Sequence, residues 1–248
     1  MNEYLSYIIL GLVQGLTEFL PVSSSGHLLL LESIGVGKPS VLNNLILHCA
    51  TLVVVLVAYR KKIAEIFRRP TAPQARFLLL ATLPTAVCAA CIRYLLPEPS
   101  FFLPFFFALN SFVLILPRFL GPTTPLLTRA PSKALFVGLM QGLACFPGLS
   151  RSGSTSAALL LAGCPREDTA EYSFLLSVPI ILGSSFVEVI TQGLDAFNLA
   201  VLPGAVVALV SGFVALKFFS KILEKKRLHL FSIYTLLMSS AAFFLLFG

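Results

Sequence analysis

The chain contains the stretch Gly11-Leu-Val-Gln-Gly-Leu-Thr-Glu-Phe-Leu-Pro-Val-Ser-Ser-Ser-Gly-His27, and it contains a near copy of it, Gly138-Leu-Met-Gln-Gly-Leu-Ala-Cys-Phe-Pro-Gly-Leu-Ser-Arg-Ser-Gly-Ser154. The two stretches align without gaps at an offset of 127 residues, and nine of their 17 positions are identical. A repeat of this kind in a 248-residue chain predicts two related halves, about residues 1–120 and 130–248. We expect the two halves to form one membrane domain, residues 1–248.

The composition is typical of an integral membrane protein. Hydrophobic residues make up 57% of the chain, charged residues only 12%, and the mean hydropathy is +0.91. The net charge of +7 comes from Lys and Arg in short loops between apolar runs, where membrane topology accounts for it. We therefore expect contacts with membrane lipids and no nucleic-acid partner. No early basic region precedes the first apolar stretch, so we expect this stretch to be retained and not cleaved as a signal peptide.

Six apolar runs are long enough to cross a hydrocarbon core of roughly 30 Å. They cover residues 43–59, 77–97, 101–119, 170–190, 199–219 and 229–247. The two repeated stretches differ from these runs, because proline and small polar residues interrupt them at Pro21 to Gly26 and at Pro147 to Ser154. Irregular backbone at membrane depth is tolerated only where protein or water satisfies its polar groups. Each repeated stretch therefore predicts a re-entrant helix-turn-helix hairpin.

The fold class predicted is an all-α integral membrane protein with six transmembrane helices and two re-entrant hairpins. One hairpin and three spanning helices in each half predict an inverted-topology repeat, because an odd number of crossings turns the second half upside down. The loop after the first span is cytoplasmic by the positive-inside rule, since it holds Arg60, Lys61, Lys62, Arg68, Arg69 and Arg76. The same side then receives Arg118, Arg129, Lys133, Arg166 and the segment Lys217 to Arg227. Both termini are expected outside, where Lys38 is the basic residue at the opening of the first hairpin.

Ionisable side chains inside a membrane are costly, and by default they mark functional sites. Glu18, His27 and Arg151 are the leading candidates, and all three lie in the repeated stretches. Because the two hairpins enter from opposite faces, their turns are expected to meet near the middle of the membrane. The residues brought together there would be Glu18, Ser23, Ser24, Ser25, His27, Ser150, Arg151, Ser152 and Thr155.

This grouping has the chemistry of phosphate binding and transfer. Arg151 offers a planar fork of donors for phosphate oxygens, and the turn around it leads into a helix whose free N–H groups favour an anion. A serine hydroxyl beside a histidine could be a nucleophile with its base. Glu18, with Gln14 one helical turn earlier, supplies oxygens that suit Mg²⁺ or Ca²⁺. Each residue also has a plain structural reading, but their joint occurrence at two matched turns favours a site.

Three motifs resemble those of the bacterial undecaprenyl-diphosphatase family of the bacitracin-resistance type. They are Gln14-Gly-Leu-Thr-Glu18, Ser23-Ser-Ser-Gly-His27 and Pro147-Gly-Leu-Ser-Arg-Ser-Gly-Ser-Thr155. The resemblance implies hydrolysis of undecaprenyl diphosphate to undecaprenyl phosphate and inorganic phosphate, which recycles the lipid carrier for cell-wall synthesis and gives bacitracin resistance. It also implies a divalent cation, Mg²⁺ or Ca²⁺, and a multi-pass protein of the bacterial inner membrane whose active site opens to the periplasmic face.

The same resemblance implies roles for individual residues. By motif position, Ser24 is the nucleophile, His27 its acid/base partner and Arg151 the diphosphate clamp. Glu18 and Gln14 form the metal or acid/base pair. The implied substrate-binding residues are Ser23, Ser25, Gly26, Gly148, Ser150, Ser152 and Thr155. An attack by a neighbouring serine or by water stays open, as does the choice between Mg²⁺ and Ca²⁺.

A flippase or transporter of a polyprenyl phosphate lipid is the alternative function, because inverted repeats with broken helices are typical of secondary transporters. The nucleophile and acid/base groups favour an enzyme. The sequence leaves open whether the chain forms a homodimer. Outside the site, we expect His48 to make a structural polar contact. Arg93 and Glu188 lie near the outer ends of their helices, and we expect both to extend to the membrane interface without a functional role.

Overall fold

The computed structural model describes residues 2–37, 40–95, 99–119, 131–192 and 198–247, and across these ranges it contains helices and no β-strand. Lys38 and Arg129, which entered the topology prediction, lie outside the described residues, as do residues 96 and 97 of the predicted span 77–97. The helices are α1 Glu3–Phe19, α2 Ser24–Ser33, α3 Val41–Ala58, α4 Arg60–Arg68, α5 Pro73–Leu95, the 3₁₀ helix η1 Pro99–Phe102, α6 Leu103–Phe119, α7 Pro131–Leu143, α8 Arg151–Leu161, α9 Arg166–Gln192, α10 Val201–Glu224 and α11 Leu230–Phe247.

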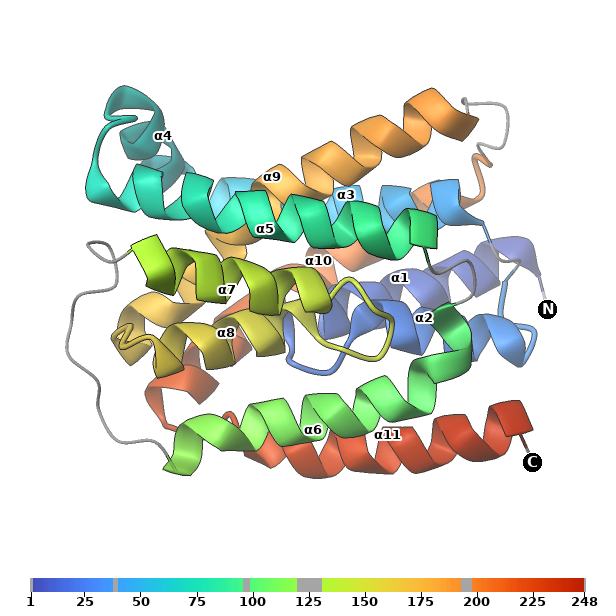
Figure 1. Cartoon of the computed structure of the whole chain (residues 1–248). Helices are drawn as coiled ribbons and strands as arrows, with labels where there is room; N and C mark the ends of the chain where they lie inside the picture. The colour runs from blue at the N-terminus through green and yellow to red at the C-terminus, as the bar shows by residue number, and fades with distance from the viewer. Residues whose placement is uncertain (1, 38–39, 96–98, 120–130, 193–197, 248) are drawn as a thin grey trace.

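Five helices are long and apolar enough to cross a membrane: α3, α5, α9, α10 and α11. The remaining predicted span, residues 101–119, corresponds to α6. This helix is apolar but has only 17 residues. α6 runs beside α11 along most of its length (Figure 1). The protein is therefore an all-α, multi-pass membrane protein.

The two repeated stretches form helical hairpins that point in opposite directions (Figure 1). The α1–α2 hairpin opens toward the end of the molecule where both termini lie, and the α7–α8 hairpin opens toward the end that carries α4. α1 ends at Phe19 and α2 begins at Ser24, whereas α7 ends at Leu143 and α8 begins at Arg151. Both predicted interruptions, Pro21 to Gly26 and Pro147 to Ser154, therefore extended too far, because the helices already resume at Ser24 and at Arg151.

A serine cap starts the second helix of each hairpin in the same way. The Ser23 hydroxyl accepts a hydrogen bond from the Gly26 amide at 3.4 Å, and the Ser150 hydroxyl accepts one from the Gly153 amide at 3.1 Å. Serine is a preferred N-cap because its side chain satisfies an amide that has no partner within the helix. The cap at Ser150 explains why helix α8 begins earlier than the sequence pattern suggested.

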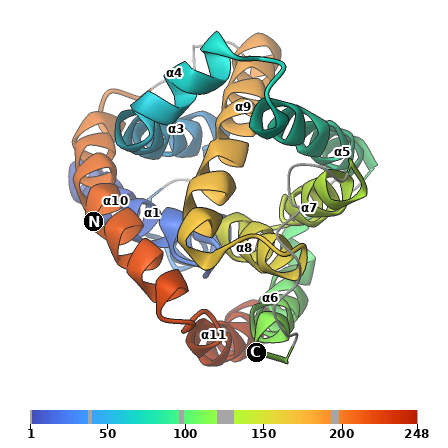
Figure 2. The same cartoon turned by 90° about the vertical axis from the view of Figure 1, so that its left-hand side faces the viewer.

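The first helix of each hairpin packs against a helix of the other half, α1 against α10 and α7 against α5 (Figure 2). Glycines allow this close approach, since a Cβ at Gly11 would clash with the backbone of Gly204, and one at Gly138 would clash with the backbone of Ala81. Small residues at helix contacts are the usual way in which membrane helices gain packing energy. The two halves are thus interlocked, and neither hairpin is held only by its own half.

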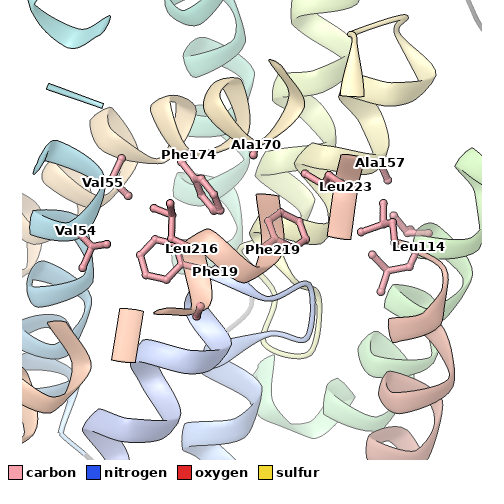
Figure 3. Packing of buried hydrophobic residues seen from close by; sticks show 13 residues of the cluster. Phe19, Val54, Val55, Leu114, Ala157, Ala170, Phe174, Leu216, Phe219 and Leu223 are labelled. Carbon is pink, nitrogen blue, oxygen red and sulfur yellow. The ribbon is translucent and has the colours of Figure 1, made fainter. Parts of the chain in front are cut away.

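A cluster of buried aromatic rings packs around the C-terminal end of α1 (Figure 3). The Phe19 ring lies 5.2 Å from that of Phe174 on α9, and Phe174 lies 5.8 Å from Phe219 on α10. Val54 and Val55 of α3 line the same cluster. Because Phe19 follows Glu18 in the chain, this packing fixes the last turn of α1 and with it the carboxylate of Glu18.

Candidate active site

The carboxylate of Glu18 lies at the centre of a network of polar side chains from both hairpins. The Ser24 hydroxyl donates a hydrogen bond to Glu18 Oε2 at 2.5 Å, and Arg151 Nη2 donates one to Glu18 Oε1. Gln14 Nε2 donates to Oε2 at 3.0 Å, and His48 Nδ1 lies 3.2 Å from the same oxygen. His48, for which the sequence predicted only a structural contact, is therefore part of this network.

The network is largely shielded from the surroundings. Glu18 is 7% exposed and Ser24 8%, while the Arg151 side chain is 19% exposed. Removing one partner of a buried ion pair usually costs about 3–5 kcal/mol, because the other charge is left without compensation. The Glu18–Arg151 pair therefore holds the two hairpins together across the break in each, and it leaves Arg151 partly accessible from one side.

His27 does not make the hydrogen bond to Ser24 that the motif suggested. Its Nδ1 lies 2.7 Å from the carbonyl oxygen of Ser23, and its Nε2 lies 2.6 Å from the hydroxyl of Tyr234 on α11. The residue bonded to the Ser24 hydroxyl is Glu18. The expected serine–histidine pair is thus replaced by a serine–carboxylate pair, because the ring of His27 turns away toward α11.

Hydrogen bonds join the two turns directly. The Ser23 hydroxyl accepts a bond from the amide of Gly148 at 3.0 Å. Asn110 of α6 bridges both turns, since its Nδ2 donates to the carbonyl of Pro21 at 3.0 Å and its Oδ1 accepts from the amide of Ser150 at 3.0 Å. Sequence reasoning missed Asn110, and the available signal was a single amide side chain inside an otherwise apolar span.

Gly148 is one position where only glycine fits. Its φ is +99°, and a Cβ there would approach the carbonyl of Leu103, the side chain of Phe106 and the amide of Phe107. Glycine adopts this left-handed backbone without steric cost. The second turn can therefore lie flat against α6, which brings the Gly148 amide to the Ser23 hydroxyl.

A cavity of about 270 Å³ opens beside the network. Its polar lining consists of Thr17, Glu18, Ser23, Ser24, Ser25, His48, Ser150, Arg151 and Ser184. Its apolar lining consists of Leu45, Ala89, Ala144, Cys145, Leu149, Ile180 and Ile181. α2 begins at Ser24 and α8 at Arg151, so two helix N-termini lie at the cavity wall, where an anion is favoured. The cavity suits a ligand that has an anionic group next to an apolar one.

The predicted substrate-binding residues fall into two groups. Ser23, Ser25 and Ser150 line the cavity. The others make hydrogen bonds within the protein. The Ser152 hydroxyl donates to the carbonyl of Leu20 at 2.9 Å, and the Thr155 hydroxyl donates to Gln141 Oε1 at 3.5 Å. The backbone amides of Gly26 and Gly148 donate to the Ser23 hydroxyl.

Glu18 and Gln14 are the side chains of this network whose oxygens could hold a divalent cation together with a bound phosphate. Among the described residues there is no group of three or more His, Cys, Asp or Glu side chains that could hold a metal ion. However, Gln14 Oε1 is buried without a hydrogen-bond partner, and it belongs to the side chain that contacts Glu18. Mg²⁺ is commonly held by one or two carboxylates together with substrate phosphates and water. Glu18 and Gln14 would be the protein ligands of such an ion.

Arg93 and Glu188 lie outside this site, and they form an ion pair that the sequence did not predict. Arg93 Nη1 donates to Glu188 Oε2 at 2.6 Å. The pair joins α5 to α9, and each residue lies in the last two turns of its helix.

The fold and the site define a multi-pass membrane protein with a buried, mixed-charge cavity where two helical hairpins meet. The chain matches the family model of bacitracin resistance protein BacA over residues 7–241, and it belongs to that family.

Several curated proteins named undecaprenyl-diphosphatase are similar to it. The one from Korarchaeum cryptofilum is 34% identical over 264 residues, which cover 98% of this chain and 100% of that protein. The one from Thermosipho africanus is 34% identical over 250 residues, covering 97% and 99%. The one from Carboxydothermus hydrogenoformans is 36% identical over 257 residues, covering 94% of each. The family resemblance drawn from the three motifs is confirmed.

Proposed function

We propose that this chain hydrolyses undecaprenyl diphosphate to undecaprenyl phosphate and inorganic phosphate. The observation that carries the proposal is the contact of Ser24 and Arg151 with the two oxygens of the same buried carboxylate, Glu18. Such an arrangement would supply a nucleophile, a base and an anion-binding group at one cavity. The relatives named undecaprenyl-diphosphatase support the substrate, since they align over nearly the whole chain. The activity recycles the lipid carrier for cell-wall synthesis and gives bacitracin resistance.

The Ser24 hydroxyl is the attacking group. Its oxygen forms a bond to the terminal phosphorus while its proton passes to Glu18 Oε2, the oxygen to which it already donates. The bond between that phosphorus and the bridging oxygen breaks, and undecaprenyl phosphate leaves with the bridging oxygen. A water molecule then attacks the phosphoserine, which releases inorganic phosphate and restores the serine hydroxyl.

Arg151 binds the terminal phosphate during both steps. In the free protein it pairs with Glu18, so a phosphate has to attract the guanidinium away from this carboxylate. The exchange is favourable in geometry, because the planar fork of an arginine matches phosphate oxygens. It also frees Glu18 to take the serine proton. A divalent cation held by Glu18 and Gln14, Mg²⁺ or Ca²⁺, would neutralise charge on the diphosphate.

Glu18, and not His27, is the proposed partner of the serine nucleophile. The motif alone implied His27, but the hydrogen bond of Ser24 goes to Glu18, and both ring nitrogens of His27 bond to other groups. General acid–base catalysis requires the base within hydrogen-bond reach of the proton that it removes. Only Glu18 meets this condition among the described residues of the free protein.

The proposed architecture is an inverted-topology repeat of two re-entrant hairpins in the bacterial cytoplasmic membrane. Its support is the opposite direction of the hairpins, together with the basic α4 at the end away from the termini. The cavity would open toward the periplasmic face. Leu45 and His48 lie in the first half of α3, which starts at that face, and Ala89 lies in the last third of α5, which ends there.

The direct test is the release of inorganic phosphate from undecaprenyl diphosphate by purified protein in detergent, with and without a chelator. Detergent removes the sealed membrane that a transporter needs, so turnover in micelles supports the enzyme. We expect cation-dependent release. A folded preparation that binds the lipid but releases no phosphate would contradict the proposed phosphatase activity and favour a flippase of polyprenyl phosphate lipids.

A further inference from the structure

Resting on the proposed phosphatase activity, we propose that Tyr234 of α11 is a positioning residue that acts through His27 on the turn that presents Ser24. No sequence motif includes Tyr234, and it is separated from His27 by 207 residues. The two side chains meet because α11 packs against α6, which carries the opposite wall of the His27 pocket.

The hydrogen bonds of His27 define its tautomer. A carbonyl oxygen only accepts, so the 2.7 Å contact with Ser23 requires a proton on Nδ1. In the neutral ring, Nε2 then carries a lone pair and accepts the hydroxyl proton of Tyr234 at 2.6 Å. Tyr234 therefore selects the form of His27 that donates to Ser23.

Two aromatic rings fix the orientation of His27. The Tyr234 ring is stacked on the imidazole with an angle of 2° between the planes, and the Phe107 ring meets it edge-on at 87°. Phe107 and Tyr234 are separated by 127 residues, the offset of the internal repeat. The two halves thus supply one ring each, and only the second ring has a hydroxyl group. Packing alone does not require this hydroxyl, because Phe107 packs without one.

The bond from His27 holds a strained backbone. Ser23 has a φ of +70° and a ψ of 92°, in a region that side-chain-bearing residues rarely adopt. Strain of this kind persists only where surrounding contacts hold it, and it is common at functional sites. In this conformation the Ser23 hydroxyl accepts the amide of Gly148, and the next residue, Ser24, points its hydroxyl at Glu18.

These contacts form a continuous chain from α11 to the nucleophile. Tyr234 orients His27, His27 holds the carbonyl of Ser23, and Ser23 sets the position of Ser24. Neither Tyr234 nor His27 is among the residues that line the cavity, although both lie in the described part of the chain. Their effect on turnover is therefore expected to be indirect.

The test is a double-mutant cycle of Tyr234→Phe and His27→Gln, measured on purified protein in detergent. Tyr234→Phe keeps the stacked ring and removes one hydrogen bond, so we expect kcat to fall about three- to tenfold while KM stays within about twofold. In the His27→Gln background, Tyr234→Phe should have no further effect, because the partner of its hydroxyl is gone. The melting temperature is recorded for all four proteins and should show the same non-additivity.

The control is Ser239→Ala, which removes another hydroxyl of α11. Ser239 donates to the carbonyl of Pro104 on α6 at 2.7 Å, so the variant deletes a bond of similar length that joins α11 to α6 and not to α2. We expect its kcat to stay within about twofold of wild type. An equal loss in Ser239→Ala and Tyr234→Phe would mean that α11 acts only by packing, and would overturn the proposal.

Two further results would also overturn it: full activity in Tyr234→Phe, or an equal effect of Tyr234→Phe in both backgrounds. If His27→Gln is inactive, the double-mutant cycle is evaluated from the melting temperatures alone. Additive shifts of the melting temperature would then contradict the coupling between Tyr234 and His27. If wild-type protein releases no phosphate, the proposed function fails, whereas the melting temperatures still decide whether Tyr234 and His27 are coupled.

Discussion

The two hairpin turns share a serine cap but carry different chemistry. Ser23 and Ser150 occupy equivalent positions 127 residues apart, and both cap the helix that follows. The residues of the proposed chemistry differ between the turns: Glu18 corresponds to Cys145, and Ser24 corresponds to Arg151. In our proposal the first turn supplies the carboxylate and the nucleophile, and the second supplies the guanidinium group.

Gln14 and Gln141 occupy equivalent positions of the two repeated stretches, and here the residue type is the same. Gln141 Nε2 donates to Thr85 at 3.2 Å and to the carbonyl of Leu176 at 3.4 Å, and its Oε1 accepts from Thr155. Gln14 contacts Glu18 through Nε2, but its Oε1 is buried without a partner. Buried polar atoms without partners are rare and costly, so they call for an explanation. We propose that a ligand completes the site at the unpaired oxygen of Gln14, whereas both amide atoms of Gln141 already have partners within the protein.

Of the matched substitutions in the two turns, those at Glu18 and Cys145 are expected to differ most in their effect on kcat. Glu18→Gln removes the proposed base, so kcat should fall by about 10²–10⁴. Cys145→Ala, the matched change in the second turn, should stay within about threefold. Phosphate release by both purified variants, with circular dichroism to check folding, measures the contrast. Similar losses in the two variants would mean that Glu18 has no chemical role.

The next effect is expected from Arg151→Lys. The substitution keeps the positive charge but loses the planar fork, so we expect kcat/KM to fall by about 10²–10³. Phosphate release at several substrate concentrations separates a loss in kcat from a rise in KM. A lysine variant with wild-type kcat/KM would show that the second turn supplies only charge and not geometry.

Asn110→Leu tests the bridge that holds the two turns together. It removes both hydrogen bonds of Asn110 and leaves the carbonyl of Pro21 and the amide of Ser150 unpaired, which should cost about 1–3 kcal/mol for each buried group. We expect a lower melting temperature in detergent and about a tenfold loss of kcat. The control is Leu237→Ala, at the equivalent position of the other half, where the side chain is 65% exposed. If both variants melt like wild type, Asn110 does not hold the turns.

The smallest effect concerns the two glutamines. Gln14→Leu should raise the cation concentration needed for half-maximal activity by about three- to tenfold, since one neutral oxygen ligand is lost. Gln141→Leu should lower the melting temperature instead and leave the cation dependence unchanged. Titration of Mg²⁺ and Ca²⁺ into chelator-treated protein measures both. An unchanged titration curve for Gln14→Leu would remove this residue from the metal site.

The periodic features of the fold were predictable from the sequence. The repeat, the hairpins' polar turns and the apolar spans are local patterns, and the helices follow them. The main departures are the starts of α2 at Ser24 and of α8 at Arg151, which lie inside the predicted interruptions. The grouping of Glu18, Ser24 and Arg151 was also accessible, because matched turns in two halves imply that they meet. Polar residues in an apolar chain carry this information by their position alone.

The partners of individual side chains were not predictable. Tyr234 reaches His27, Asn110 reaches the turns, and Arg93 reaches Glu188 only through helix packing across large sequence separations. A tyrosine in an apolar span looks the same in the sequence whether it faces lipid or a histidine. For the same reason the motif suggested His27 as the partner of Ser24, although the fold turns the ring toward α11.

The central claim, that Ser24 attacks and Glu18 accepts its proton, is tested most directly by comparing Ser24→Ala with Ser25→Ala. Both serines line the cavity, but only the Ser24 hydroxyl is bonded to Glu18. The measurement is phosphate release from undecaprenyl diphosphate by the two purified variants in the same detergent and cation. We predict that Ser24→Ala has no activity above background and that Ser25→Ala loses no more than about tenfold. Substantial turnover by Ser24→Ala would contradict the account and point to attack by water or by another serine.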